Sequence, residues 1–82
     1  MNKTRNIDYC KAFGENLRKI RNEKKMTMME LAFEADIEYS QIAKIERGVT
    51  NTTISTVYIL AKALDVKPNE LFKFDFVVKK KK

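Results

Sequence analysis

The sequence predicts a small all-α domain made of five short helices. The chain has 82 residues, of which 44% are hydrophobic and 34% charged. This length supports one hydrophobic core and is too short for a second. Apolar residues recur three and four positions apart through most of the chain, which is the spacing of one helix face. We therefore expect a single domain over residues 1–82, with helix start and stop signals dividing the pattern.

The first helix is expected over residues 8–23, with Asp8 as its N-cap. Gly14 inside this helix costs about 1 kcal/mol relative to alanine, so we expect it to permit a close approach by another helix. The inward-facing residues are spaced four and three apart and are Phe13, Leu17 and Ile20.

The second and third helices form a helix-turn-helix pattern. Thr27 and Glu30 have the form of a capping box, which starts a helix that ends near residue 35. Asp36 tolerates a left-handed conformation and begins a three-residue turn. The third helix follows over residues 39–47, and Gly48 supplies its C-terminal stop. Two short helices joined in this way are typical of a helix-turn-helix.

The fourth and fifth helices follow a loop. Thr53 is expected to cap the fourth, which ends at Leu64, and Pro68 suits the first position of a short fifth helix over residues 68–73. Apolar and polar residues alternate imperfectly over residues 74–78, which is consistent with a short strand. The fourth helix has a wide apolar face, suited to the centre of the domain: Ile54, Val57, Tyr58, Leu60, Ala61 and Leu64.

The missing residue types exclude several classes of protein. With no His, one Cys and two Gly, the chain cannot form a His-based catalytic triad, a Cys/His zinc site or a glycine-rich phosphate loop. A single cysteine suggests a reducing, cytoplasmic environment. The longest apolar run, residues 57–61, is too short to span a membrane. We expect a non-enzymatic binding protein with no metal, no cofactor and no membrane partner.

The net charge of +6 is unevenly distributed. Residues 1–26 hold eight positive and three negative side chains, whereas residues 27–48 hold two and five. The last four positive charges are the run Lys79 to Lys82. That run is either a solvated end or a source of non-specific attraction to phosphates.

Five segments together resemble the phage-repressor-like helix-turn-helix DNA-binding family, also called the Cro/repressor or xenobiotic-response-element type. The resemblance implies a compact five-helix repressor-like domain over residues 13–72, followed by a C-terminal extension over residues 73–82. It also implies a sequence-specific transcriptional regulator, a repressor or controller of bacterial or phage origin, which binds an inverted-repeat DNA operator as a dimer. The segments are residues 13–21, 27–32, 42–48, 60–66 and 70–72.

The resemblance also implies a role for individual residues. In this family the third helix enters the major groove. An ion pair between Arg21 and Glu46 would tie the first helix to the third. The base-reading positions fall on Tyr39, Ser40, Ala43 and Lys44. The phosphate-binding positions fall on Thr27, Arg47, Thr50, Asn51 and Thr52.

The helix-turn-helix also departs from the family pattern. Met28 replaces a glutamine that bridges to phosphate in many members, Asp36 replaces a frequent glycine, and Glu38 replaces the usual Ser or Thr cap. Because residues 27–48 carry a net negative charge, an alternative function remains open. In that alternative the fold is a protein-interaction module, such as an antitoxin, whose main partner is another protein.

The end of the chain offers a candidate dimer interface. Its aromatic and aliphatic side chains are too numerous for a core already built by four helices, and contiguous exposed apolar surface usually marks an interaction site. A second possibility is that the same residues fold back over their own domain. The residues are Phe72, Phe74, Phe76 and Val78.

Overall fold

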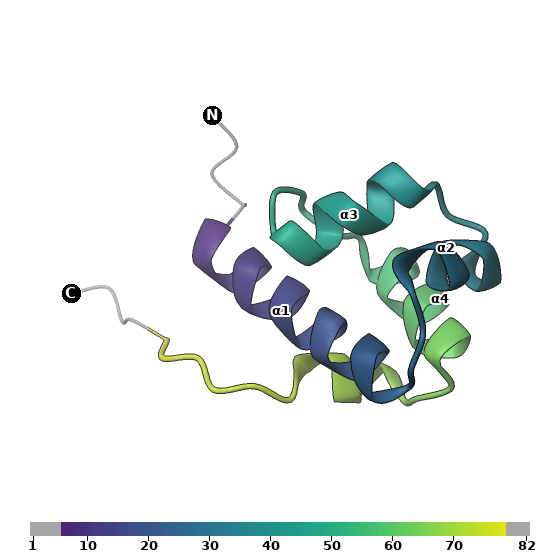
Figure 1. Cartoon of the computed structure of the whole chain (residues 1–82). Coiled ribbons are helices and arrows are strands. Elements are labelled where there is room, and N and C mark those ends of the chain that lie inside the picture. The colour runs from purple at the N-terminus through teal and green to yellow at the C-terminus, as the bar shows by residue number, and fades with distance from the viewer. Residues whose placement is uncertain (1–5, 79–82) are drawn as a thin grey trace.

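The computed structural model describes residues 6–78 and confirms the all-α class (Figure 1). The run Lys79 to Lys82 lies outside the described residues. Four α-helices are followed by a short 3-10 helix, so the expected fifth helix is present in a tighter form. The elements are α1 (Ile7–Glu23), α2 (Met28–Ala35), α3 (Tyr39–Arg47), α4 (Ile54–Leu64) and η1 (Pro68–Phe72).

Polar side chains cap the N-termini of three of the helices. The capping box of α2 is present: the Glu30 amide donates to the Thr27 hydroxyl at 3.0 Å, and the Thr27 amide donates to the Glu30 carboxylate at 2.8 Å. Thr53 caps α4 in the expected way. The expected cap of α1 was wrong, because the side chain of Asn6, not that of Asp8, accepts a hydrogen bond from a free amide of the first turn, that of Tyr9. Asp8 lies instead in the first turn, where its charge suits the helix dipole.

Left-handed residues end α2 and α3. Asp36 has φ 56° and ends α2, and Gly48 has φ 74° and ends α3. The Ile37 amide donates to the Ala32 carbonyl at 3.0 Å, which satisfies a carbonyl at the end of α2 while Ile37 packs against the core. The turn between α2 and α3 is therefore fixed by backbone hydrogen bonds and by an apolar anchor.

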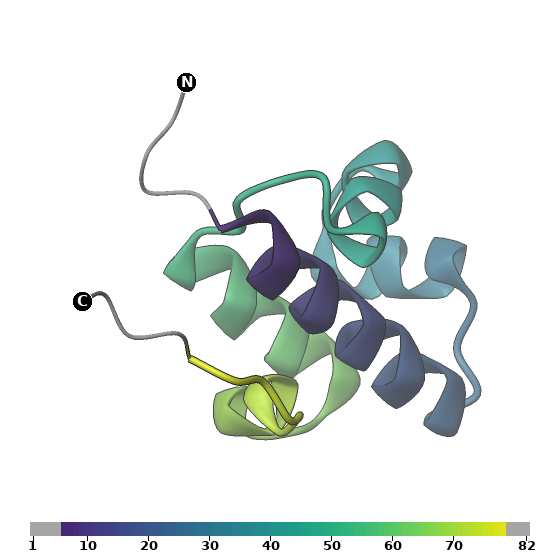
Figure 2. The same ribbon diagram turned by 90° about the vertical axis from the view of Figure 1, so that its left-hand side faces the viewer.

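The core lies where the five elements converge. Figure 1 shows α3 above α1, with α2 and α4 packed together beside them. In Figure 2, residues 73–78 leave η1 and run back toward the start of α1. Every element contributes at least one of the largest fully buried side chains, which are Leu17, Leu31, Ile42, Ile45, Leu60, Leu64 and Leu71.

Two expectations for the C-terminal half were wrong. Ile54 and Tyr58 were expected in the buried face of α4, but they are 89% and 58% exposed. Spacing identifies a helix face correctly, but only the neighbouring elements decide how much of that face is covered. Residues 74–78 form no strand, and no strand occurs anywhere within residues 6–78. With no neighbouring strand to complete a ladder, this segment instead follows α1 as irregular chain.

No helix within residues 6–78 combines the length and the apolar character needed to cross a bilayer. The same part of the chain has no group of three or more acidic or cysteine side chains placed to hold a metal ion.

Candidate nucleic-acid interface

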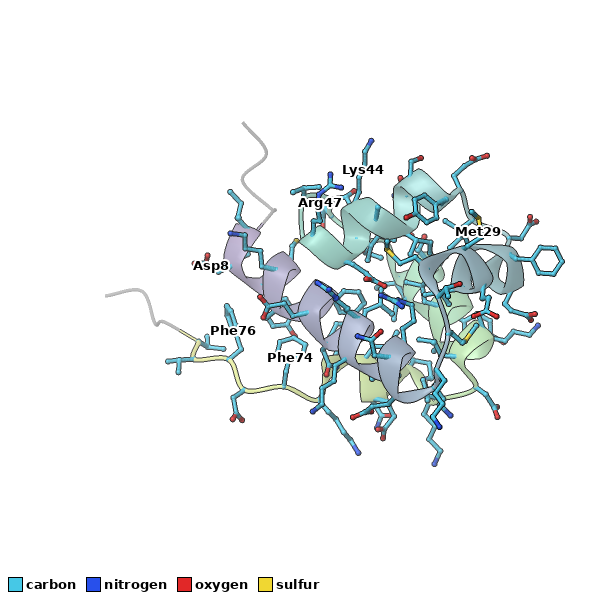
Figure 3. All side chains as sticks on the ribbon, in the orientation of Figure 1. Asp8, Met29, Lys44, Arg47, Phe74 and Phe76 are labelled. Atoms are coloured by element: carbon cyan, nitrogen blue, oxygen red, sulfur yellow. The ribbon has the colours of Figure 1, made fainter. Side chains whose placement is uncertain are left out.

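Helix α3 has two sides with different environments. Its inner side carries Ile42, Ile45 and Glu46, all buried against the rest of the domain. Its outer side carries the predicted base-reading residues, and Figure 3 shows Lys44 projecting from α3 on the side away from α1. The outer side consists of exposed Tyr39, Ser40, Lys44 and Arg47 with half-buried Ala43.

This outer side has the shape and chemistry to read DNA bases. Its residues recur at spacings of three and four, so they form one stripe along a helix about 10–12 Å wide, which fits a major groove about 12 Å wide. Lys44 offers ammonium donors, and Ser40 and Tyr39 offer hydroxyl groups. Ala43 presents a methyl group, which can contact the methyl group of thymine. The structure brings the four predicted base-reading residues together, and their contact with DNA stays a prediction.

The start of α2 lies beside this stripe. Thr27, Met28 and Tyr39 line the same shallow depression of about 550 Å³. The capping box occupies the Thr27 amide and one acceptor position of its hydroxyl, which leaves the hydroxyl hydrogen to donate. The amides of Met28 and Met29, in the first helical turn, lack an intrahelical acceptor and suit an anion.

The loop after α3 carries the remaining predicted phosphate residues. Arg47 ends α3, and the Val49 amide donates to the Lys44 carbonyl at 3.1 Å, which closes the helix end. Asn51 and Thr52 line a small cavity of about 160 Å³ together with side chains of α1 and Phe72. The loop therefore borders the start of α1 as well as the end of α3.

An ion pair fixes the inner side of α3 to α1. Arg21 Nε donates to Glu46 Oε2 at 2.6 Å, and Arg21 Nη2 donates to Oε1 at 3.1 Å. The two side chains are only 9% and 6% exposed. This hydrogen bond raises the pKa of Arg21 above its ordinary value, against the opposing effect of burial. Arg21 Nη1 also donates to the Met26 carbonyl at 2.7 Å, so one guanidinium joins α1, α3 and the approach to α2.

Gly14 confirms the expected close approach of a second helix. A Cβ atom at Gly14 would lie 2.3 Å from the Ile45 carbonyl oxygen and 2.6 Å from that of Glu46. Real Cβ atoms essentially never come this close to another heavy atom, and backbone carbonyls cannot rotate away as a side chain can. The backbones of α1 and α3 are therefore in direct contact beside the ion pair.

Sequence reasoning missed a third anchor, Asn16. Its amide nitrogen donates to the Glu70 carbonyl at 3.1 Å and to the Leu71 carbonyl at 2.8 Å. These bonds satisfy two carbonyls of η1 and hold it against α1. The sequence did contain a signal for Asn16: it is a polar residue on the apolar side of the helix, beside Leu17 and one turn from Phe13. A buried amide on such a face requires partners.

The outer surface carries opposite charges at its two ends. Four exposed acidic side chains belong to α2 and the turn before α3: Glu30, Glu34, Asp36 and Glu38. Lys44 and Arg47 lie toward the other end of α3, where the exposed basic residues Lys11 and Arg18 of α1 border the same region. The cationic end is therefore the better place to hold a polyanion.

The residues of the predicted dimer interface lie beside α1. Phe74 and Phe76 place their ring centroids 5.3 Å and 4.9 Å from that of Tyr9, and Phe72 lies 5.1 Å from Phe13. The rings thus fold back over their own domain, which was the second possibility considered. Figure 3 shows Phe74 and Phe76 pointing from the C-terminal segment toward α1. Val78 does not join them and is 79% exposed.

Comparisons with known proteins agree with this geometry. A helix-turn-helix family model matches residues 17–71. Control protein C.BamHI of Bacillus amyloliquefaciens is 40% identical over 63 residues, covering 76% of this chain and 78% of that protein. The restriction-modification controller protein C.AhdI from Aeromonas hydrophila superposes with a TM-score of 0.75 at 36% identity, covering 77% of this chain and 96% of that chain. The controller C.Esp1396I, solved as a tetramer with its natural 35 base-pair operator, gives a TM-score of 0.73 at 31% identity, covering 79% and 86%.

Proposed function

The chain belongs to this helix-turn-helix family, and we propose that it is a sequence-specific DNA-binding transcriptional regulator that binds an inverted-repeat operator as a homodimer. The observation that carries the proposal is the outer side of α3. There Tyr39, Ser40 and Lys44 are exposed on a helix whose inner side is held by backbone contact and an ion pair. A recognition helix needs this combination of a fixed position and free side chains.

Two groups of residues have different parts in DNA binding: one group reads bases and the other binds phosphates. Near the N-terminal end of α3, Tyr39 and Ser40 meet base edges, and Lys44 donates to guanine O6 or N7. Ala43 contacts a thymine methyl group. Phosphate contacts set the position of α3 in the groove without reading sequence. We assign them to Thr27, Arg47, Thr50, Asn51 and Thr52.

We further propose that the regulator assembles through η1 and the C-terminal segment. One helix-turn-helix covers only a few base pairs, so operator specificity requires two copies about 34 Å apart. The predicted interface was Phe72, Phe74, Phe76 and Val78. Phe74 and Phe76 already pack against Tyr9 of their own domain. A second copy of the chain would therefore cover the outer surface of these three aromatic rings. Phe72, Val77 and Val78 remain exposed there.

Sedimentation at micromolar concentration tests the interface. We expect a dimer for the unaltered chain and a monomer for Val78→Asp. Phe33→Asp makes the same apolar-to-acidic change at an 83% exposed residue of α2 and should leave the dimer intact. A monomeric chain that binds a complete operator with full affinity would contradict the proposal.

The relatives named above support a regulator of the controller type, because one is named a control protein and the other two are restriction-modification controller proteins. They lend no support to the alternative of an antitoxin-like interaction module. We also propose that the protein acts in the cytoplasm, where bacterial DNA is accessible, and that it needs no cofactor. Its activity would then follow its own concentration through dimer formation and operator occupancy.

Selection of DNA sites from a random pool tests the function directly. The unaltered chain should enrich an inverted repeat whose half-site centres are about one DNA turn apart. The enriched duplex should bind with an affinity that falls as salt increases, since counterions are released from the DNA. Failure to enrich any duplex, with the protein folded, would contradict the function.

A further inference from the structure

A groove lies between α1 and α3 beside the outer side of α3. We call it the α1–α3 groove; its volume is about 460 Å³. Ala43 and Arg47 belong both to this groove and to the outer side of α3, so the groove opens next to the predicted base-reading residues. Its lining residues are Lys11, Glu15, Arg18, Arg21, Met28, Ala43, Glu46 and Arg47.

Backbone contacts at two glycines hold the walls of the groove in place. At Gly14 the carbonyls of α3 touch α1, as described above. At Gly48 a Cβ atom would lie 2.4 Å from the Cα atom of Lys11, so the end of α3 also lies directly on α1. These contacts fix Lys11 beside the loop that follows Arg47. Arg18 is seven residues after Lys11 and therefore lies on the same face of α1.

The groove has an excess of positive charge that other side chains do not neutralise. Four cationic and two anionic residues line it. Arg21 and Glu46 neutralise each other in the buried ion pair. Residues 6–78 contain two ion pairs, Arg21 with Glu46 and Lys73 with Glu70. In this part of the chain, Lys11, Arg18 and Arg47 therefore have no carboxylate within ion-pair distance. Glu15 is the single carboxylate left to oppose these three exposed cations.

We propose that the α1–α3 groove binds the phosphodiester backbone of the DNA strand that borders α3, with Lys11 and Arg18 donating to phosphate oxygens beside Arg47. This inference rests on the proposed function and adds α1 to the DNA-binding surface. The groove would add backbone contacts at the cationic end of α3 to the contact assigned to Thr27 at the start of α2.

The salt dependence of operator binding tests the role of Lys11 and Arg18. Lys11→Gln and Arg18→Gln should each reduce the slope of log K against log salt by about one per subunit. The loss of affinity between 50 and 200 mM salt should therefore shrink by roughly threefold per contact. Base preference should not change, since phosphate contacts carry no direct sequence information.

A charge-matched control separates local contact from overall charge. Lys62→Gln removes one positive charge from an exposed residue of α4 that does not line the groove, and it should leave the slope nearly unchanged. If Lys11→Gln and Arg18→Gln behave like Lys62→Gln, the inference is overturned. A lower melting temperature at an unchanged slope would overturn it too, because Lys11 would then only stabilise the negative end of the α3 dipole.

Two further measurements identify the phosphate. Replacing single operator phosphates by neutral methylphosphonates should reveal a position that matters for the unaltered chain and no longer matters for Arg18→Gln. Millimolar inorganic phosphate should not raise the melting temperature through Lys11 and Arg18. If it does, and no operator phosphate depends on them, the groove is a free-anion site and the inference fails. Failure of the unaltered chain to select any DNA would instead remove the proposed function itself.

Discussion

The two sides of α3 differ in what holds them and in what they can contact. The inner side is buried, touches the backbone of α1 at Gly14 and holds Glu46 in an ion pair with Arg21. The outer side is exposed, and Ser40 and Lys44 are open to solvent there. One helix therefore separates two tasks: the inner side fixes where the helix lies, and the outer side is free to specify a sequence.

This difference predicts two separable classes of variant. Changes on the inner side should alter the free energy of unfolding and leave the preferred DNA sequence unchanged. Changes on the outer side should alter the preferred DNA sequence or the affinity for DNA. They should leave the free energy of unfolding nearly unchanged, because substitutions at exposed positions usually shift it by less than about 0.5 kcal/mol.

The ion pair should give the largest effect. Arg21→Ala and Glu46→Ala each leave a buried charge without its partner, which costs about 3–5 kcal/mol when the pair is fully buried. Denaturant unfolding should show both losses, and the double variant should lose less than their sum. Arg18→Ala removes the same chemical group from an exposed position of α1 and should change little. Strictly additive losses would show that the two residues do not interact.

Gly14→Ala should give the next largest effect, in the direction opposite to the usual one. In an exposed helix this change stabilises by about 1 kcal/mol. Here the new Cβ atom meets two backbone carbonyls of α3, so we expect a net loss of roughly 1–3 kcal/mol, as for other overpacked sites. Thermal unfolding measures it, with the exposed Lys19→Ala as a control on the same helix. A stabilised Gly14→Ala protein would contradict the direct backbone contact.

Arg47→Gln should give the smallest effect and no change in stability. Arg47 lies at the exposed end of α3, where it is assigned to a phosphate. Its loss should weaken binding to all sequences alike and reduce the salt slope by about one per subunit. Binding titrations at several salt concentrations, on selected and on scrambled duplexes, provide the measurement. A loss confined to the selected duplex would assign Arg47 to base reading instead.

Local signals in the sequence predicted most of the helices. Thr27 and Glu30 lie within one turn, as do Thr53 and the amide it caps, so their chemistry depends on neighbouring residues alone. The limits of α3 at Gly48 and of α2 at Asp36 are local for the same reason. The pairing of Arg21 with Glu46 spans 25 residues and came from the family resemblance, not from spacing.

Contacts between distant segments were beyond the sequence pattern. Asn16 bonds to carbonyls 54 and 55 residues away, and no local periodicity encodes those partners. The exposure of Tyr58 depends on which elements cover α4. Residues 74–78 alternate like a strand, but their aromatic rings have a better partner in Tyr9 than in any neighbouring backbone. The α1–α3 groove likewise exists only once two glycines bring α1 and α3 together.

The most direct test of the two-sided account compares two adjacent residues of α3, Lys44 on the outer side and Ile45 on the inner side. Site selection from a random DNA pool and thermal unfolding are measured for the unaltered chain, for Lys44→Ala and for Ile45→Val. Lys44→Ala should relax the base preference at one position of each half-site by roughly 1–3 kcal/mol and should leave unfolding unchanged. Ile45→Val should lower stability by about 0.5–1.5 kcal/mol and select the same sequence as the unaltered chain. If Lys44→Ala selects the same sequence with the same affinity, the outer side of α3 does not read DNA and the account is wrong.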